Sequence, residues 1–239
     1  NRTTTSRYFW GSAATARHMA VSWSQIPHVT SQDEADITEL ESLRQRHKAD
    51  VEKEGGKLTL SAFTLKAAAA ALRRFFRFNA SLDPGSDELI VKEYCHIGVA
   101  VDTEDGLIVP VLRDVDKKSI SELAVELTEL AEKTRQRKAS LEEMQGASFT
   151  LTNIGALGGG FFTPVINYPQ VAILGTGAAK TKPVVRENRA GGQSIVPRLM
   201  LPMVVAIDHR VLDGADAVRF LRTVIDLLED PEKMLLQIG

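Results

Sequence analysis

The sequence is short of cysteine, of net charge and of long apolar runs, and each shortage excludes a class of protein. Cys95 is the single cysteine in 239 residues, which rules out an internal disulfide and a cysteine-based metal cage within one chain. A reducing compartment is the natural setting. No apolar run reaches the ~18 residues of a membrane-spanning helix, so we expect no membrane contact. The 29 basic and 31 acidic residues leave a net charge of −2, which does not predict nucleic-acid binding.

The histidines are few, and none has the spacing of a metal-binding motif. No pair follows the HExxH pattern, and no second cysteine accompanies them. We therefore predict no metal site within the chain and expect structural or surface roles for most of them. They are His18, His28, His47, His96 and His209.

Two glycine-rich stretches follow predicted strands and invite comparison with phosphate-binding loops. Residues 155–160 (GALGGG) have no helical pattern behind them, and residues 175–180 (GTGAAK) lack the GxxxxGK[ST] spacing of a P-loop. The dinucleotide-binding fingerprint also needs a helix start and an acidic residue about 20 positions further on. We interpret these glycines as places where the backbone turns tightly.

Hydrophobic periodicity predicts helices and strands in an irregular order. Residues 1–16 are polar and small and are interpreted as a flexible arm or linker remnant, and residues 17–239 as one domain. A capping box from Ser119 to Glu122 opens one predicted helix. Helices are expected over 17–25, 35–54, 60–78, 119–137 and 215–228, with a short one beginning at 230. Strands are expected from residue 28 onwards and over 96–101, 107–112, 148–152, 171–175 and 199–207. The strands over 96–101 and 107–112 are expected to form a hairpin.

Strict alternation of strand and helix is missing from this order. The predicted fold class is therefore α+β, a mixed sheet with helices on one face. No internal repeat and no low-complexity linker divides the chain.

The stretch over residues 208–214 (DHRVLDG) concentrates candidate chemistry. An apolar strand (LMLPMVVAI) runs directly into it, and a helical pattern follows Gly214. A histidine at the end of a rigid strand, here His209, can be held in a fixed geometry. Asp213 lies four residues later. From the residues alone, a catalytic histidine and a structural histidine beside a helix N-cap aspartate stay equally open.

This stretch resembles the DHRxxDG motif of the dihydrolipoyl acyltransferases, which are the catalytic cores of two-oxo-acid dehydrogenase complexes. It is similar, more loosely, to the HHxxxDG motif of chloramphenicol acetyltransferase. The resemblance covers about residues 17–239, is closest to the pyruvate (acetyl) type, and implies a trimeric, chloramphenicol-acetyltransferase-like fold. Further segments that resemble the family in order are 24–30 (SQIPHVT), 36–44 (DITELESLR), 78–82 (FNASL), 96–102 (HIGVAVD), 106–110 (GLIVP), 149–155 (FTLTNIG) and 162–167 (FTPVIN).

The resemblance implies transfer of an acyl group between the dihydrolipoyl thiol and coenzyme A. Coenzyme A, or its acyl form, is then a substrate, and the lipoyl group is carried outside this chain. His209 is expected to act as the general base. A free thiol has a pKa near ~8.5, so it needs a base at neutral pH. No covalent enzyme intermediate is required, and Cys95 is expected in the core.

The family's oxyanion donor is a serine, and Thr152 stands at the matching position. The hydroxyl is kept, but threonine adds a methyl and a stiffer rotamer. Asp213 is expected to pair with Arg44 and so hold the catalytic turn. Coenzyme A is expected to meet Lys66 and Arg113, with Arg73 and Arg74 as further phosphate partners and with Phe162 and Asn167 on the channel wall.

The resemblance also implies an assembly. In the family the active site lies between subunits of a trimer, and trimers form a 24-mer or 60-mer core. The apolar C-terminal residues 233–239 are expected to dock on another trimer. A lipoyl domain, and domains that bind the dehydrogenase and dihydrolipoyl dehydrogenase components, are expected upstream. The implied compartment is the bacterial cytoplasm or the mitochondrial matrix.

Two other functions remain as alternatives. One is a non-catalytic structural core component, and the presence of the histidine, aspartate, arginine and threonine together argues against it. The other is a free coenzyme A-dependent acetyltransferase of a small hydroxyl compound, and the Asp-His-Arg triplet argues against that.

Overall fold

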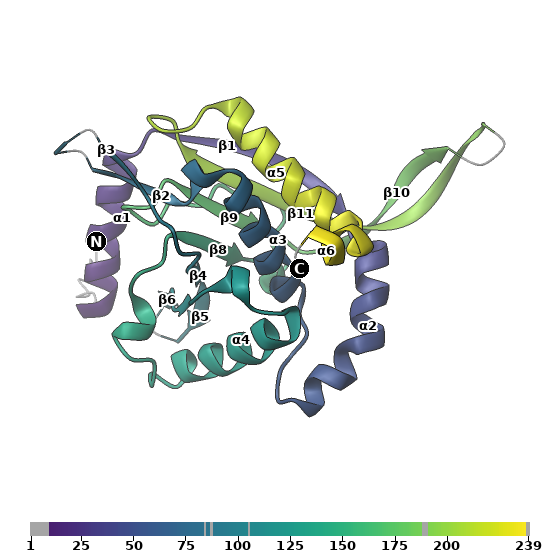
Figure 1. Cartoon of the computed structure of the whole chain (residues 1–239), viewed down its shortest axis with the longest axis horizontal. Coiled ribbons are helices and arrows are strands. Elements are labelled where there is room, and N and C mark those ends of the chain that lie inside the picture. The colour runs from purple at the N-terminus through teal and green to yellow at the C-terminus, as the bar shows by residue number, and fades with distance from the viewer. Residues whose placement is uncertain (1–9, 84, 87, 105, 188–190, 238–239) are drawn as a thin grey trace, which may run out of the picture.

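A mixed sheet of seven strands forms the centre of the molecule (Figure 1). The computed structural model describes residues 10–83, 85–86, 88–104, 106–187 and 191–237. The strand order is β1-β11-β9-β8-β4-β7, and β10 pairs with the first half of β11. The members are β1 (His28–Asp36), β4 (Ile97–Val99), β7 (Val111–Leu112), β8 (Phe149–Asn153), β9 (Ala172–Thr176), β10 (Lys180–Glu187) and β11 (Gln193–Asp208).

The middle of the sheet is parallel and its flanks are antiparallel. Strands β4, β8 and β9 run parallel to one another, whereas β11 runs antiparallel to β1, β9 and β10. Every residue of β9 is buried, as expected for a central strand covered on both faces. Two small hairpins lie outside the sheet: β2 (Ala80–Asp83) with β3 (Glu88–Val91), and β5 (Val101–Thr103) with β6 (Gly106–Ile108).

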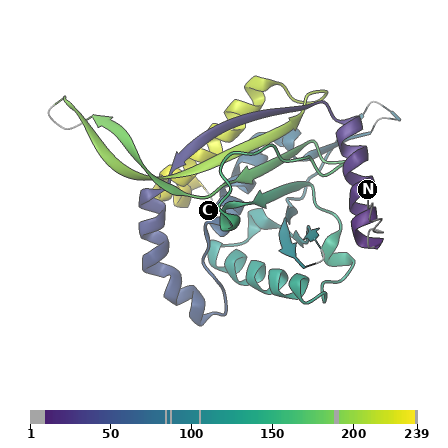
Figure 2. The same ribbon diagram turned by 180° about the vertical axis from the view of Figure 1, so that it is seen from behind.

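The long helices α3 and α5 cover one face of the sheet. Phe220 of α5 stacks on Phe78 with ring centroids 4.2 Å apart and also contacts the Phe149 ring of β8, so helix and sheet share one core. Seen from behind, the strands lie in front of α3 and α5 (Figure 2). This arrangement confirms the predicted mixed sheet with helices on one face. The helices are α1 (Trp10–Gln25), α2 (Thr38–Lys53), α3 (Leu60–Arg74), α4 (Ile120–Arg135), α5 (Gly214–Glu229) and α6 (Pro231–Gln237).

Several predicted boundaries differ from the structure. The first helix begins at Trp10, so residues 10–16 are helical rather than part of an arm, and residues 1–9 lie outside the described part. β1 continues to Asp36, which places the start of α2 three residues later than predicted. The capping box of α4, from Ser119 to Glu122, is confirmed. The β2–β3 hairpin was not predicted.

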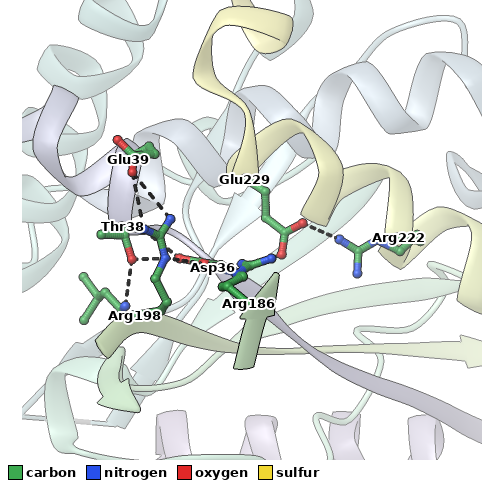
Figure 3. A network of polar contacts seen from close by, with 8 residues as sticks. Asp36, Thr38, Glu39, Arg186, Arg198, Arg222 and Glu229 are labelled. Atoms are coloured by element: carbon green, nitrogen blue, oxygen red, sulfur yellow. Dashed lines mark hydrogen bonds and ion pairs between the residues drawn. The ribbon is translucent and has the colours of Figure 1, made fainter. Parts of the chain in front are cut away.

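The hairpin formed by β10 and the first half of β11 projects from the body of the molecule (Figure 1). A network of ion pairs at its base joins it to β1 and α5 (Figure 3). Asp36, which is almost fully buried, accepts hydrogen bonds from Arg186 at 2.5 Å and from Arg198 at 2.7 Å. Its backbone N–H donates to Glu229, which in turn binds Arg222. The hairpin is thus anchored at its root.

Candidate active site

His209 follows the last residue of β11 directly, and its side chain is exposed to solvent. Its backbone N–H donates to the carbonyl of Pro27 at 3.0 Å. Among the described residues, none forms a hydrogen bond with its imidazole ring. The backbone of His209 is therefore held while its ring stays available to a ligand.

Asp213 begins α5 as its N-cap. Its carboxylate accepts a hydrogen bond from the backbone N–H of Asp216 at 2.8 Å, within a capping box. This hydrogen bond holds the pKa of Asp213 below its usual value. The aspartate thus fixes the start of α5, four residues after His209.

The predicted pair of Asp213 and Arg44 does not form within the chain, which corrects that prediction for a single subunit. Arg44, on α2, makes a two-point contact with Glu41, with Nε and Nη2 each 2.7 Å from a carboxylate oxygen. Its Nη1 donates to the carbonyl of Leu58 at 2.9 Å. The guanidinium turns to Glu41 because this acid lies one helical turn earlier on α2.

Thr152 lies on the face of the sheet opposite α3 and α5. It shares this face with Thr150, whose hydroxyl donates to Gln170, whereas Asn153 contacts α3 through Ser61. Across the strands, Thr152 is level with Gly175. The sheet therefore presents the Thr152 hydroxyl away from the helical core.

The Phe162 ring lies over Gly175, the residue of β9 that is aligned with Thr152. Gly175 is aligned with Val204 of β11, and a Cβ on Gly175 would come within 2.6 Å of the Phe162 ring. Only a glycine leaves room for the ring at this point. Phe162 and Thr152 therefore border one surface of the sheet.

His209 and Thr152 lie far apart within one chain. Thr152 is level with Gly175, Gly175 is level with Val204, and His209 follows Val204 by five residues along β11. Five residues of strand span about 16 Å, and two strand spacings add about 10 Å across the sheet. General-base catalysis needs contact distances near ~3 Å. One chain therefore does not bring the two predicted catalytic groups together, and their surroundings are called the His209 half-site and the Thr152 half-site below.

A cavity of about 320 Å³ lies on the α3 side of the sheet, opposite the Thr152 side chain, and is lined by Arg44, Asn153 and the glycine loops. A second cavity of about 440 Å³ lies beside it. Both are lined by Ser61 and Asn153, whose side chains form a 3.2 Å hydrogen bond between them. Sequence reasoning missed these two residues because nothing local links α3 to the end of β8. Arg44 thus lines a cavity on the α3 side of the sheet, and Thr152 does not line that cavity.

The two predicted phosphate partners carry other contacts. Lys66 is buried on α3, and its ammonium donates to the carbonyls of Asp116 at 2.8 Å and Lys118 at 2.6 Å. Burial lowers its pKa. Arg113 donates to the carbonyls of Glu142 and Gln145. Both cations are bound to backbone carbonyls of their own chain, and their contacts with coenzyme A stay predictions.

Asn167 connects the channel-wall segment to α1. The Nε2–H of His18 donates to the Asn167 side-chain oxygen at 2.8 Å. His28 joins the same segment, since its Nε2 accepts the backbone N–H of Ile166 at 3.0 Å and its Nδ1–H donates to Ile26. His18 and His28 therefore have the structural roles predicted for most of the histidines.

Cys95 and the glycine loops behave as predicted. Cys95 is buried, and burial raises the pKa of its thiol to about 12, so it is no nucleophile at neutral pH. Gly155 and Gly177 touch so closely that a Cβ on Gly155 would come within 2.4 Å of the Gly177 carbonyl. The glycines allow two loops to meet.

A larger cavity, of about 890 Å³, lies away from both half-sites. It is lined by Lys66, Arg73 and the start of α4, with Met234 and Leu235 of α6 at its side. Across the described ranges, no cluster of three or more histidine, cysteine or acidic side chains has the geometry of a metal site. Within the same ranges, no helix combines the length and hydrophobicity needed to cross a membrane.

Comparison with known sequences adds an independent finding. The family model for 2-oxoacid dehydrogenases acyltransferase (catalytic domain) matches residues 11–236. The chain is 49% identical over 221 residues to the dihydrolipoyllysine-residue acetyltransferase component of the pyruvate dehydrogenase complex of Azotobacter vinelandii, covering 92% of this chain and 34% of that protein. The corresponding component of Bacillus subtilis is 43% identical over 224 residues, covering 94% and 50%. The chain thus spans a third to a half of these relatives.

Solved structures show the same relationship. The Azotobacter vinelandii dihydrolipoamide acetyltransferase, studied for a serine, a histidine and an asparagine in its catalytic mechanism, superposes with a TM-score of 0.93 at 45% identity, covering 98% of this chain and 94% of that one. The cubic core of the pyruvate dehydrogenase multienzyme complex gives the same values. Chloramphenicol acetyltransferase, at 16% identity and a TM-score of 0.54, covers 89% and 94% and shares the fold. The chain therefore belongs to the 2-oxoacid dehydrogenase acyltransferase family and represents its catalytic domain.

Proposed function

We propose that this chain transfers an acetyl group between the dihydrolipoyl thiol and coenzyme A, at a site completed by two copies of the chain. The observation that carries the proposal is the position of His209. It directly follows β11, no described residue binds its imidazole ring, and it lies about 16 Å along the strand direction and about 10 Å across the strands from Thr152. The family membership of the chain supports the reaction class.

In the reaction, His209 of one copy takes the proton of the attacking thiol. The sulfur adds to the thioester carbonyl, and the carbonyl oxygen becomes an oxyanion. The Thr152 hydroxyl of the second copy donates a hydrogen bond to this oxygen. Collapse of the intermediate expels the other thiolate, which takes the proton back from the imidazolium. A donor aimed at the oxyanion is worth roughly 3–4 kcal/mol of transition-state stabilisation.

The pairing of Arg44 with Asp213 is proposed between copies. Arg44 lines the cavity between α3 and the end of β8, whereas Asp213 stands beside His209 at the start of α5. In this proposal the trimer brings Arg44 of one copy to Asp213 of the next. The pair then links the catalytic turn of one copy to α2 of the next. Phe162 and Asn167 belong to the channel wall in this proposal.

The proposed assembly is a trimer that builds a larger core, of which a 24-mer cube is favoured. A solved relative is a cubic core at 45% identity. The exposed Leu235 and Leu236 of α6, 66% and 86% accessible, support docking of the C-terminal residues on another trimer. A lipoyl domain supplies the dihydrolipoyl group, and dehydrogenase components bind through other parts of the full protein. The bacterial origin of the relatives supports a bacterial cytoplasmic setting.

The test is acetyl transfer from acetyl-CoA to dihydrolipoamide, followed by thioester absorbance. His209→Ala is expected to lower turnover by at least ~100-fold, the scale on which general-base catalysis acts. Assembly, measured by light scattering, is expected to stay unchanged because the ring of His209 has no hydrogen bond within the described chain. His47→Ala, an exposed histidine on α2, is the matched control. Equal turnover in the wild type and His209→Ala contradicts the mechanism, and no turnover with any acyl-CoA favours a structural core component.

A further inference from the structure

The residues on either side of His209 bind each other. Asp208 is 1% exposed and Arg210 keeps a side-chain accessibility of 31%. The Arg210 Nε lies 3.0 Å from one carboxylate oxygen of Asp208, and its Nη2 lies 2.6 Å from the other. The backbone N–H of Arg210 also donates to Asp208, at 3.0 Å. Three nitrogen atoms of Arg210 thus donate hydrogen bonds to the Asp208 carboxylate, and Nε reaches both of its oxygens.

This arrangement encloses the backbone of His209. The carbonyl of Asp208 accepts the N–H groups of Val211 and Leu212, both at 3.0 Å, and His209 donates its own N–H to Pro27. Every backbone N–H from Asp208 to Asp213 therefore has a hydrogen-bond acceptor. The imidazole ring is the free part of this turn.

Burial of a carboxylate is costly, and a guanidinium that binds it at two points compensates the cost. The hydrogen bond to Asp208 raises the pKa of Arg210 further, so the arginine stays charged. A buried ion pair of this kind is poor evidence for added stability, since apolar residues of similar size often serve as well. The two residues of the pair flank His209, so a role in holding the backbone of His209 in place explains their position better than added stability does.

We propose that Asp208 and Arg210 form a positioning pair that fixes the backbone of His209, so that its ring projects from the strand end in one orientation towards the neighbouring copy. This inference rests on the proposed function, because it assigns the pair a role in the same reaction. Neither side chain takes or gives a proton in that reaction. Arg210 acts through His209 alone, by way of the Asp208 carboxylate.

The test compares Arg210→Met, which removes the charge and both donors, with Arg210→Lys, which keeps the charge and offers a single point of contact. Misplacement of a catalytic group by ~1 Å costs on the order of 100-fold in rate. We expect kcat of Arg210→Met to fall by about 10- to 100-fold while KM for both substrates changes by less than about threefold. Arg210→Lys is expected to lie between Arg210→Met and the wild type. Millimolar guanidinium is expected to restore part of the kcat of Arg210→Met.

The matched control is Arg222→Met, which breaks another arginine–carboxylate contact, at the far end of α5. Its kcat per assembled particle is expected to match the wild type. The proposal is overturned if Arg210→Met keeps the wild-type kcat. It is also overturned if the loss of kcat equals the loss of folded protein and guanidinium restores none of it.

Crystal structures of the wild type and Arg210→Met separate this proposal from the proposed function. We expect one orientation of His209 in the wild type and several in the variant. An unchanged His209 turn in Arg210→Met rules out the positioning role, whatever the activity. Absence of transfer in the wild type overturns the proposed function alone.

Discussion

At the scale of the residue, the hydroxyl of Thr152 stands where the family resemblance places a serine. Its neighbours leave room for threonine in place of serine. Gly175, which is aligned with Thr152 on the next strand, has no side chain, and the Phe162 ring lies over Gly175. The extra methyl of threonine therefore meets no opposing side chain on β9. Within the described part of the chain, no hydrogen bond occupies the Thr152 hydroxyl, so it is available as a donor.

We expect Thr152→Val to lower kcat by roughly 100- to 1000-fold, as the loss of one oxyanion donor does in other enzymes. Thr152→Ser keeps the donor and is expected to stay within about fivefold of the wild type. Both are measured as acetyl transfer to dihydrolipoamide, with thermal unfolding as the control for folding. Full activity in Thr152→Val shows that another group stabilises the oxyanion.

At the scale of the element, the root of the β10–β11 hairpin depends on one buried carboxylate. A two-stranded hairpin is marginally stable by itself in water, so its root contacts matter. Burial raises the pKa of Asp36, but hydrogen bonds from Arg198, Thr38 and Arg186 outweigh burial and lower it to about 2 (Figure 3). The ionised form of Asp36 thus stabilises the folded hairpin.

Because the pKa of Asp36 is lower in the folded state than its ordinary value of 3.8, the stabilisation is fully present above about pH 4. It is lost as the pH falls towards 2. The loss is expected to be about 2 kcal/mol in the free energy of hairpin opening. Hydrogen exchange of the hairpin amides between pH 5 and 2 measures it. In Asp36→Asn this part of the pH dependence disappears, and an identical slope in both proteins contradicts the assignment.

At the scale of the whole molecule, the two half-sites lie at different places on one sheet. His209 directly follows β11 near the start of α5, whereas Thr152 lies in β8, two strands away and aligned through Gly175 with Val204. A symmetric oligomer offers each chain the missing half from a neighbour. The catalytic unit is then a pair of adjacent subunits.

Assemblies that contain two different variant chains test whether His209 and Thr152 of one site come from different subunits. Thr152→Val and His209→Ala are each expected to be nearly inactive alone. In trimers formed from equal amounts of both, a chance arrangement places a wild-type histidine opposite a wild-type threonine in about one quarter of the sites. Co-expressed protein is therefore expected to recover about a quarter of wild-type turnover. No recovery, with mixing verified by mass spectrometry, shows that both residues act within one chain.

Much of the local structure was predictable from the sequence. The capping box at Ser119, the end of β11 before His209 and the buried Cys95 all follow from patterns within a few residues. The β5–β6 hairpin follows from its turn residues in the same way. Helix periodicity and cap residues act over short distances, so a short stretch of sequence carries the whole signal.

Long-range partners could not be predicted in this way. Lys66 is buried against the carbonyls of Asp116 and Lys118, fifty residues later in the chain, and Arg44 turns to Glu41. The sequence shows only that each is a cation on a helix. Which face of a helix is covered, and by what, depends on packing against distant segments.

The sequence by itself thus determined the chemistry that the chain offers: a histidine at a strand end, a threonine hydroxyl within a strand, and a single cysteine. The tertiary structure alone decided where these groups lie. Strand register places Thr152 and Val204 in one row and leaves His209 five residues beyond it. The physical reason is that register is set by pairing between strands more than twenty residues apart, which no local pattern records.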